Sequence, residues 1–139
     1  MKEQLNHANA KVPNRANPND AGADLFSPIY EKIPMGESRF IDFGVAIELP
    51  ENSVGLLFPR SSLGGKGIRL RNAVGVIDEK YRGNIGMMVE NVTGEDYEVR
   101  IGDRIAQLVI VPVLTPEIEV VDKLCMVGDR LGGFGSTGR

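Results

Sequence analysis

The 139-residue sequence contains one cysteine, Cys125, one histidine, His7, and no tryptophan. A single cysteine excludes an internal disulfide framework, and the two residues are too few for a zinc site, which takes about three or four side-chain ligands. No stretch of about 18 apolar residues occurs, and residues 1–10 lack the apolar segment of a signal peptide. We therefore expect an intracellular, soluble protein of the cytoplasm with no membrane partner.

An excess of positive charge is also absent. The chain has 16 Lys and Arg against 19 Asp and Glu, which gives a formal net charge of -3. Such a chain has no basic field to bind long nucleic acid by releasing counterions. A local cluster of arginines nevertheless suffices for a small phosphorylated ligand. We therefore expect no direct contact with nucleic acid.

Glycine and proline, by contrast, are abundant, with 17 and 8 residues, and they argue against a helix bundle. The length is that of one domain. Apolar residues alternate from Arg39 to Leu49 with the period of a half-buried strand, with Phe43 facing inward and Gly44 and Ala46 outward. Further apolar segments between turn-rich loops predict strands at Val54–Phe58, Ile85–Val92, Tyr97–Ile101, Arg104–Val113 and Ile118–Val121. This pattern predicts an all-β sandwich or barrel.

At most one short helix is expected in this all-β chain. It is a single turn near Ser61–Lys66, with Ser61 or Ser62 as its N-cap. Residues 1–20 are polar and predict a surface segment without a regular element.

Five short segments depart from strand patterning without a packing reason. Ordered along the chain, they are DAGADLFSP (20–28), PRSSLGGKGI (59–68), NAVGVIDEKYRG (72–83), GDRIAQL (102–108) and RLGGFGSTG (130–138). The second sets an Arg and two hydroxyls before a glycine loop, which can bind phosphate oxygens or form an ordinary capped turn. The third predicts a hairpin with an apolar arm at 73–77 and a polar turn at 78–82, where Asp78 is either catalytic or a turn former.

The fifth segment places a lone Phe134 among glycines and hydroxyls. One interpretation is a disordered terminus. The other is a mobile flap in which Phe134 offers a stacking face and Arg130, Ser136 and Thr137 offer phosphate donors.

Together the five segments, in this order, resemble the homotrimeric dUTPase family over Lys11 to Gly138, with GVIDEKYRG and GGFGSTG nearly intact. The resemblance implies a distorted β jelly-roll barrel over residues 1–127. It implies that residues 128–139 form a flexible, glycine-rich arm that closes over an active site. It also implies a closed homotrimer whose sites lie at the interfaces and draw segments from all three chains.

The implied activity is hydrolysis of dUTP to dUMP and pyrophosphate by a water that attacks the α-phosphorus. This reaction limits uracil in DNA and supplies dUMP for thymidylate synthesis. By resemblance, Asp78 is the catalytic carboxylate that activates the water as a general base. Mg²⁺ is held mainly by the triphosphate, and Asp24 contacts it through a bound water, as suits an ion that keeps several waters.

The resemblance also implies the substrate-binding residues. Backbone groups of Val76, Ile77 and Gly86, with the side chain of Asn72, would read the uracil edge and reject cytosine. Tyr81 would pack on the deoxyribose and reject a 2′-hydroxyl. The remaining contacts are to phosphate or cover the base, and they are assigned to Arg60, Ser61, Ser62, Gln107, Arg130, Phe134, Gly135 and Ser136.

Four features depart from the family pattern. Ala23 stands where an aromatic is frequent, Ser62 where Gly is common, and Lys80 where a second acidic residue is common. The fifth segment is also one residue shorter than usual. These departures leave Asp78 and Tyr81 in place.

Two alternatives remain open at this point. dCTP deaminase resembles the family in fold and in an R-S-S segment, but it depends on a glutamate at the position that aligns with Met88; Glu90 lies two residues on. The second alternative is a dUTPase-like subunit that mainly senses the nucleotide or binds a protein.

Overall fold

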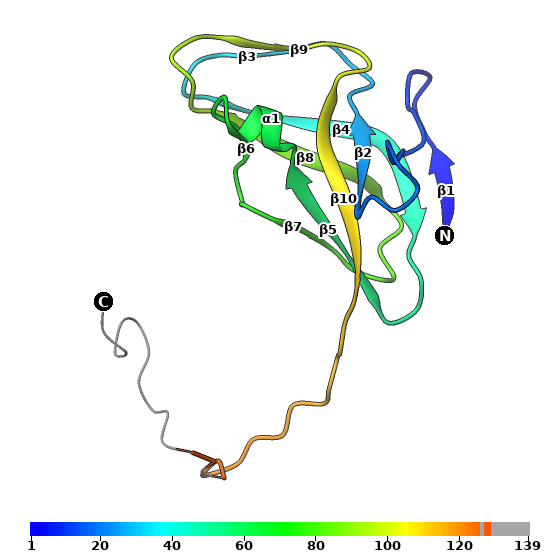
Figure 1. Cartoon of the computed structure of the whole chain (residues 1–139), viewed down its shortest axis with the longest axis vertical. Helices are drawn as coiled ribbons and strands as arrows, with labels where there is room; N and C mark the ends of the chain where they lie inside the picture. The colour runs from blue at the N-terminus through cyan, green and yellow to red at the C-terminus, as the bar shows by residue number, and fades with distance from the viewer. Residues whose placement is uncertain (126, 129–139) are drawn as a thin grey trace.

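The fold consists of ten strands and one short helix in the part of the chain that this computed structural model describes, residues 1–125 and 127–128 (Figure 1). In chain order the elements are β1 (Lys2–Leu5), β2 (Gly22–Phe26), β3 (Glu31–Ile33), β4 (Ser38–Glu48), β5 (Ser53–Pro59), α1 (Ser61–Gly64), β6 (Ile68–Leu70), β7 (Gly75–Ile77), β8 (Asn84–Asn91), β9 (Tyr97–Val99) and β10 (Arg104–Pro112). No described helix is long and apolar enough to cross a membrane.

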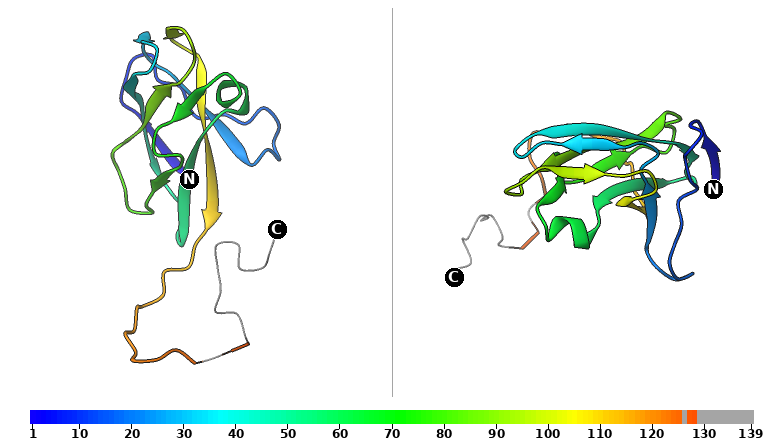
Figure 2. Two further views of the ribbon diagram at one scale, coloured as in Figure 1. Left: turned by 90° about the vertical axis from the view of Figure 1, so that its left-hand side faces the viewer. Right: turned by 90° about the horizontal axis from the view of Figure 1, so that it is seen from above.

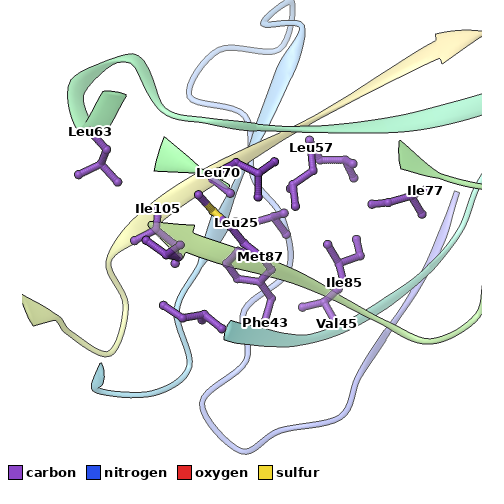
Figure 3. Close-up of a cluster of buried hydrophobic side chains, with 14 of the residues drawn as sticks. Leu25, Phe43, Val45, Leu57, Leu63, Leu70, Ile77, Ile85, Met87 and Ile105 are labelled. Atoms are coloured by element: carbon purple, nitrogen blue, oxygen red, sulfur yellow. The ribbon is translucent and has the colours of Figure 1, made fainter. Parts of the chain in front are cut away.

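The strands form two four-stranded antiparallel sheets, with the orders β1-β4-β8-β6 and β2-β10-β5-β7, and β3 pairs with β9. The views in Figures 1 and 2 show the segment that follows β10, as far as residue 125, running away from the sheets. Apolar side chains from both sheets meet in one core, which Figure 3 shows around Phe43, Leu25, Leu57, Ile85 and Met87. This architecture confirms the prediction of an all-β jelly roll.

Strand β4 confirms the predicted alternation at its inward positions, since Ile41, Phe43 and Val45 are buried. Gly44 and Ala46, however, are buried too, so the expectation of a half-buried strand with a solvent-exposed second face is wrong at these positions. The reason is the N-terminal segment, which packs over this part of β4. His7 Cβ lies 2.6 Å from the point where a Cβ of Gly44 would stand, and Gly44 has a positive φ of 66°.

The N-terminal strand β1 was not expected from the sequence. It is almost wholly exposed and polar, so it lacks the apolar alternation that identifies a half-buried strand. Backbone pairing with β4, from Lys2 opposite Glu48 to Leu5 opposite Val45, holds it in place.

Most of the other predicted strands are confirmed, since β5, β8, β9 and β10 overlap the predicted segments. The strand at Ile118–Val121 was wrong: these residues form no strand, and Ile118 and Val120 are 94% and 93% exposed. The single helical turn is confirmed as α1. Its N-cap is Arg60, without a side-chain capping bond, so neither Ser61 nor Ser62 caps it.

The predicted hairpin at residues 72–83 differs from the observed structure. Strand β7 pairs with β5, whereas β8 pairs with β4 and β6, so the two arms belong to different sheets. Each arm contributes a buried side chain from its own side, Ile77 from β7 and Ile85 from β8. The arms therefore separate, and the space between them holds a pocket.

We expect Phe43→Ala to lower the free energy of unfolding by about 3–5 kcal/mol, because Phe43 is 0% exposed and its removal leaves a cavity. Phe40→Ala is the matched control in the same strand. Phe40 is 58% exposed, so the expected loss is less than about 1 kcal/mol. Urea unfolding at equal protein concentration measures both values. Equal losses for the two variants would contradict the assignment of Phe43 to the core.

Candidate active site

A pocket of about 280 Å³ lies between β7 and β8, and we call it the β7–β8 pocket. Two of its lining residues, Gly75 and Leu57, pack closely against each other. A Cβ added to Gly75 would lie only 3.0 Å from Leu57 Cβ. The pocket brings together six of the predicted site residues: Asn72, Val76, Ile77, Asp78, Tyr81 and Gly86. Five further lining residues were not predicted: Phe40, Leu57, Gly75, Asn84 and Ile85.

The turn between β7 and β8 positions Tyr81 at this pocket. The Tyr81 N–H donates to the Asp78 carbonyl (3.0 Å), and the Tyr81 hydroxyl donates to the Asn84 carbonyl (2.9 Å). Glu79 fixes the turn from the other side by accepting a hydrogen bond from the Asn52 N–H (2.8 Å). The aromatic ring is thereby held beside the pocket with 46% of its surface exposed. It offers a flat apolar face to a ligand.

Asp78 follows directly after β7 and lines the rim of the β7–β8 pocket. The residue is exposed, and among the described residues its carboxylate has no hydrogen-bond or ion-pair partner. A carboxylate in this state can accept a proton or a hydrogen bond from a water. Its position suits a general base acting on a water beside the pocket.

A second hollow of about 370 Å³ lies where β2, β10 and the end of β5 meet, and we call it the arginine hollow. Asp24 on β2 and Gln107 on β10 are direct cross-strand partners and so share one face. Arg60 follows β5, and its Nε lies 2.8 Å from Asp24 Oδ1. Gln107 Nε2 donates to the Pro59 carbonyl (3.2 Å). The hollow thus brings together the predicted residues Asp24, Arg60, Ser61 and Gln107.

Two more residues of this region concern the phosphate site. Ser62 lies exposed on α1 and does not line the arginine hollow, so its assignment to phosphate stays a prediction. Arg104 was not assigned a role, yet its NH1 lies 3.3 Å from Asp24 Oδ2, so Asp24 is shared by two guanidinium groups. The sequence could have pointed to Arg104, because this residue belongs to the fourth of the five segments, GDRIAQL.

The donor set of the arginine hollow fits a magnesium ion that is bound largely through phosphate. Asp24 and Asp20 both line it, but the described residues contain no group of three or more His, Cys, Asp or Glu that could hold a metal by themselves. Mg²⁺ is commonly bound by one or two carboxylates together with substrate phosphates and water.

The two cavities are distinct, because no described residue lines both. The predicted contacts of the fifth segment, Arg130, Phe134, Gly135 and Ser136, lie outside the described residues and stay predictions.

The fold and these cavities define the class of protein as an all-β nucleotide-binding protein. The β7–β8 pocket suits the ring of a base, and the arginine hollow suits phosphate. Comparison with known proteins narrows this class. The sequence model of the dUTPase family matches residues 8–138. The deoxyuridine 5'-triphosphate nucleotidohydrolase of Clostridium tetani is 42% identical over 140 residues, covering 100% of this chain and 97% of that protein.

Solved structures agree. The Staphylococcus bacteriophage 80alpha dUTPase with dUPNHPP matches with a TM-score of 0.92 and 32% identity, covering 99% of this chain and 97% of that one. A variant of the dUTPase from phage phi11 of S. aureus, described with a structural Mg(II) ion, matches with a TM-score of 0.83 and 31% identity over 88% of this chain and 97% of that one. The chain therefore belongs to the dUTPase family.

We expect Arg60→Ala to lower the affinity for inorganic pyrophosphate by about 10- to 100-fold, because a hydrogen bond to a charged group contributes roughly 1.5–3 kcal/mol. Arg69→Ala is the control, since Arg69 forms a similar 2.8 Å ion pair with Glu90 away from the arginine hollow. Calorimetric titration measures both. Equal affinity of the Arg60 variant and the wild type would contradict an anion site at this hollow.

Proposed function

We infer that the protein hydrolyses dUTP to dUMP and pyrophosphate. The observation that carries this inference is Asp78, which stands on the rim of a base-sized pocket in a member of the dUTPase family. Its relatives are named for this reaction. The reaction removes dUTP before it can enter DNA and yields dUMP, the precursor of thymidylate.

Uracil recognition through backbone groups is supported by the edges that face the β7–β8 pocket. In the described part of the chain, β7 is the last strand of its sheet, so one side of Val76 and its neighbours has no strand partner. On β8, the described partner strand β6 pairs only with Val89–Asn91 and does not reach Gly86. Strand edges of this kind can offer backbone N–H and C=O groups to a ligand. Such groups match the donor and acceptor pattern of uracil, while cytosine would leave them unpaired.

The catalytic step uses Asp78 as a general base on the attacking water. Asp78 and Tyr81 lie on the same turn, so a sugar packed against the Tyr81 ring brings its α-phosphate toward the carboxylate. Arg60, Ser61 and Gln107 bind phosphate oxygens through their N–H and O–H groups. Attack at the α-phosphorus forms the P–O bond of dUMP and breaks the bond to pyrophosphate.

Magnesium is the proposed cofactor. When bound, it neutralises charge on the triphosphate and fixes its geometry. Asp24 is the residue that would hold it through a water, and Arg60 and Arg104 hold the Asp24 carboxylate in place.

The homotrimer is proposed on two observations. The β7–β8 pocket and the arginine hollow have no described lining residue in common, which supports a site formed by the pocket of one chain and the hollow of another. The segment after β10 also carries exposed apolar side chains, Leu114, Ile118 and Val120, which a neighbouring subunit can cover. The fifth segment of a third chain completes the site, with Arg130, Phe134, Gly135 and Ser136 as its contacts; residues 128–139 act as a separate arm.

The deaminase alternative is disfavoured by the residues on β8. Met88 occupies the position that aligns with the required glutamate. The Glu90 carboxylate accepts a 2.8 Å hydrogen bond from Arg69 Nε and does not line the β7–β8 pocket. Ammonia release from dCTP would reverse this conclusion. No observation favours a protein that only senses the nucleotide.

We expect Asp78→Asn to bind dUTP as the wild type does but to lower kcat by at least about 100-fold, since a general base contributes 10²–10⁴-fold. Glu79→Gln is the matched control on the same turn. The Glu79 carboxylate accepts a hydrogen bond from the Asn52 N–H and does not line the β7–β8 pocket, so this variant should keep most of its activity. Pyrophosphate release and equilibrium binding are measured for both. Undiminished turnover in the Asp78 variant would refute its catalytic role.

A further inference from the structure

A second, more apolar cavity adjoins the β7–β8 pocket. It has a volume of about 470 Å³, and we call it the apolar hollow. Five residues line both cavities and so form the wall between them: Phe40, Leu57, Asn72, Gly75 and Gly86. Leu57 is buried in the core, and the two glycines have no side chain. Phe40 is therefore the largest exposed side chain in this wall.

The position of Phe40 is set by the register of β4 and β8. Asp42 lies opposite Gly86 and Phe40 opposite Met88, so Phe40 and Gly86 are diagonal neighbours. An aromatic side chain spans such a diagonal. The ring lies over Gly86: its Cε2 and Cε1 atoms are 2.7 Å and 3.1 Å from the point where a Cβ of Gly86 would stand. The ring fills the space that a side chain at position 86 would occupy.

A single exposed apolar side chain is common on a protein surface, but Phe40 differs from such residues because it borders two cavities. Here 58% of Phe40 is exposed, although it contacts Gly86. Packing alone does not require a ring at this place, because the core lies on the opposite face of β4, with Ile41 and Phe43. The ring does, however, limit one side of the pocket whose backbone edges match uracil.

We propose that Phe40 is a specificity-determining residue that sets the size of the base pocket. It separates the β7–β8 pocket from the apolar hollow and so excludes pyrimidines that carry a substituent at C5. Backbone groups of β7 and β8 select uracil over cytosine by hydrogen bonding, whereas Phe40 selects uracil over thymine by volume. This inference rests on the proposed function, since it concerns the base bound at the same site.

The test is Phe40→Ala, assayed with dUTP, dTTP and dCTP. Without the ring the two cavities join, and the apolar hollow can receive the 5-methyl group. We expect the ratio of kcat/KM for dTTP to that for dUTP to rise about 10- to 200-fold, the discrimination that one methyl-sized group in an apolar pocket provides. The ratio for dCTP should stay unchanged, because dCTP has no C5 substituent and differs from dUTP in its hydrogen-bonding edge.

Two further variants control the interpretation. Met88→Ala shortens an apolar side chain on the same sheet face that lines the apolar hollow but not the β7–β8 pocket, and it should leave the dTTP ratio unchanged. Phe40→Leu keeps part of the wall, and its dTTP ratio should lie between those of the wild type and Phe40→Ala. It also serves as the test if Phe40→Ala does not fold.

Equilibrium binding of dUMP and dTMP is measured on the same variants, so the inference can be decided without turnover. A dTMP to dUMP affinity ratio that stays at the wild-type value in both Phe40 variants would overturn it. An equal rise for Met88→Ala, or an equal rise for dCTP, would also overturn it, because either result would show general loosening of the site. Wild-type protein that binds dUMP but fails to hydrolyse dUTP would refute the proposed function alone.

Discussion

The separation of β7 and β8 into different sheets is the constraint on which the site depends. Each arm finds its backbone partners away from the other, β7 on β5 and β8 on β4. The turn that joins them must therefore bridge two layers, and it carries Asp78 and Tyr81 at the rim of the space that results. Had the arms paired with each other, their hydrogen-bonding groups would be satisfied and no base could enter between them.

In the arginine hollow, the Asp24 carboxylate pairs with two arginine side chains. Asp24 holds Arg60 and Arg104 from two different elements, and its side chain is only 16% exposed. This arrangement keeps two guanidinium groups together that would otherwise repel each other, and it leaves their remaining N–H donors for a phosphate. This hollow and the β7–β8 pocket share no lining residue among the described ones, and in the proposed trimer the assembly of chains brings base recognition and phosphate binding together.

Much of this could be predicted from the sequence. The alternation of Ile41 and Phe43 marks β4, and the five segments identify the family and, with it, part of the lining of both cavities. Strand β1 could not be predicted, because it is polar and exposed and is held by backbone pairing with β4 and by an ion pair between Lys2 and Glu48. The contact between Asp24 and Arg104 spans 80 residues, and no local pattern encodes it. The position of Phe40 and the separation of β7 from β8 depend likewise on which strands pair and in which register. The pattern of apolar residues does not determine either.

The central claim is that one active site is completed by different chains. Mixing the Asp78→Asn and Arg60→Ala subunits by joint unfolding and refolding tests it most directly, because each defect lies in a different cavity. Each variant alone should be nearly inactive. In random mixed trimers about one quarter of the sites combine an intact pocket with an intact hollow, so the mixture should regain roughly a quarter of wild-type dUTP hydrolysis. Activity no higher than that of the separate variants would contradict the account and place the whole site within one chain.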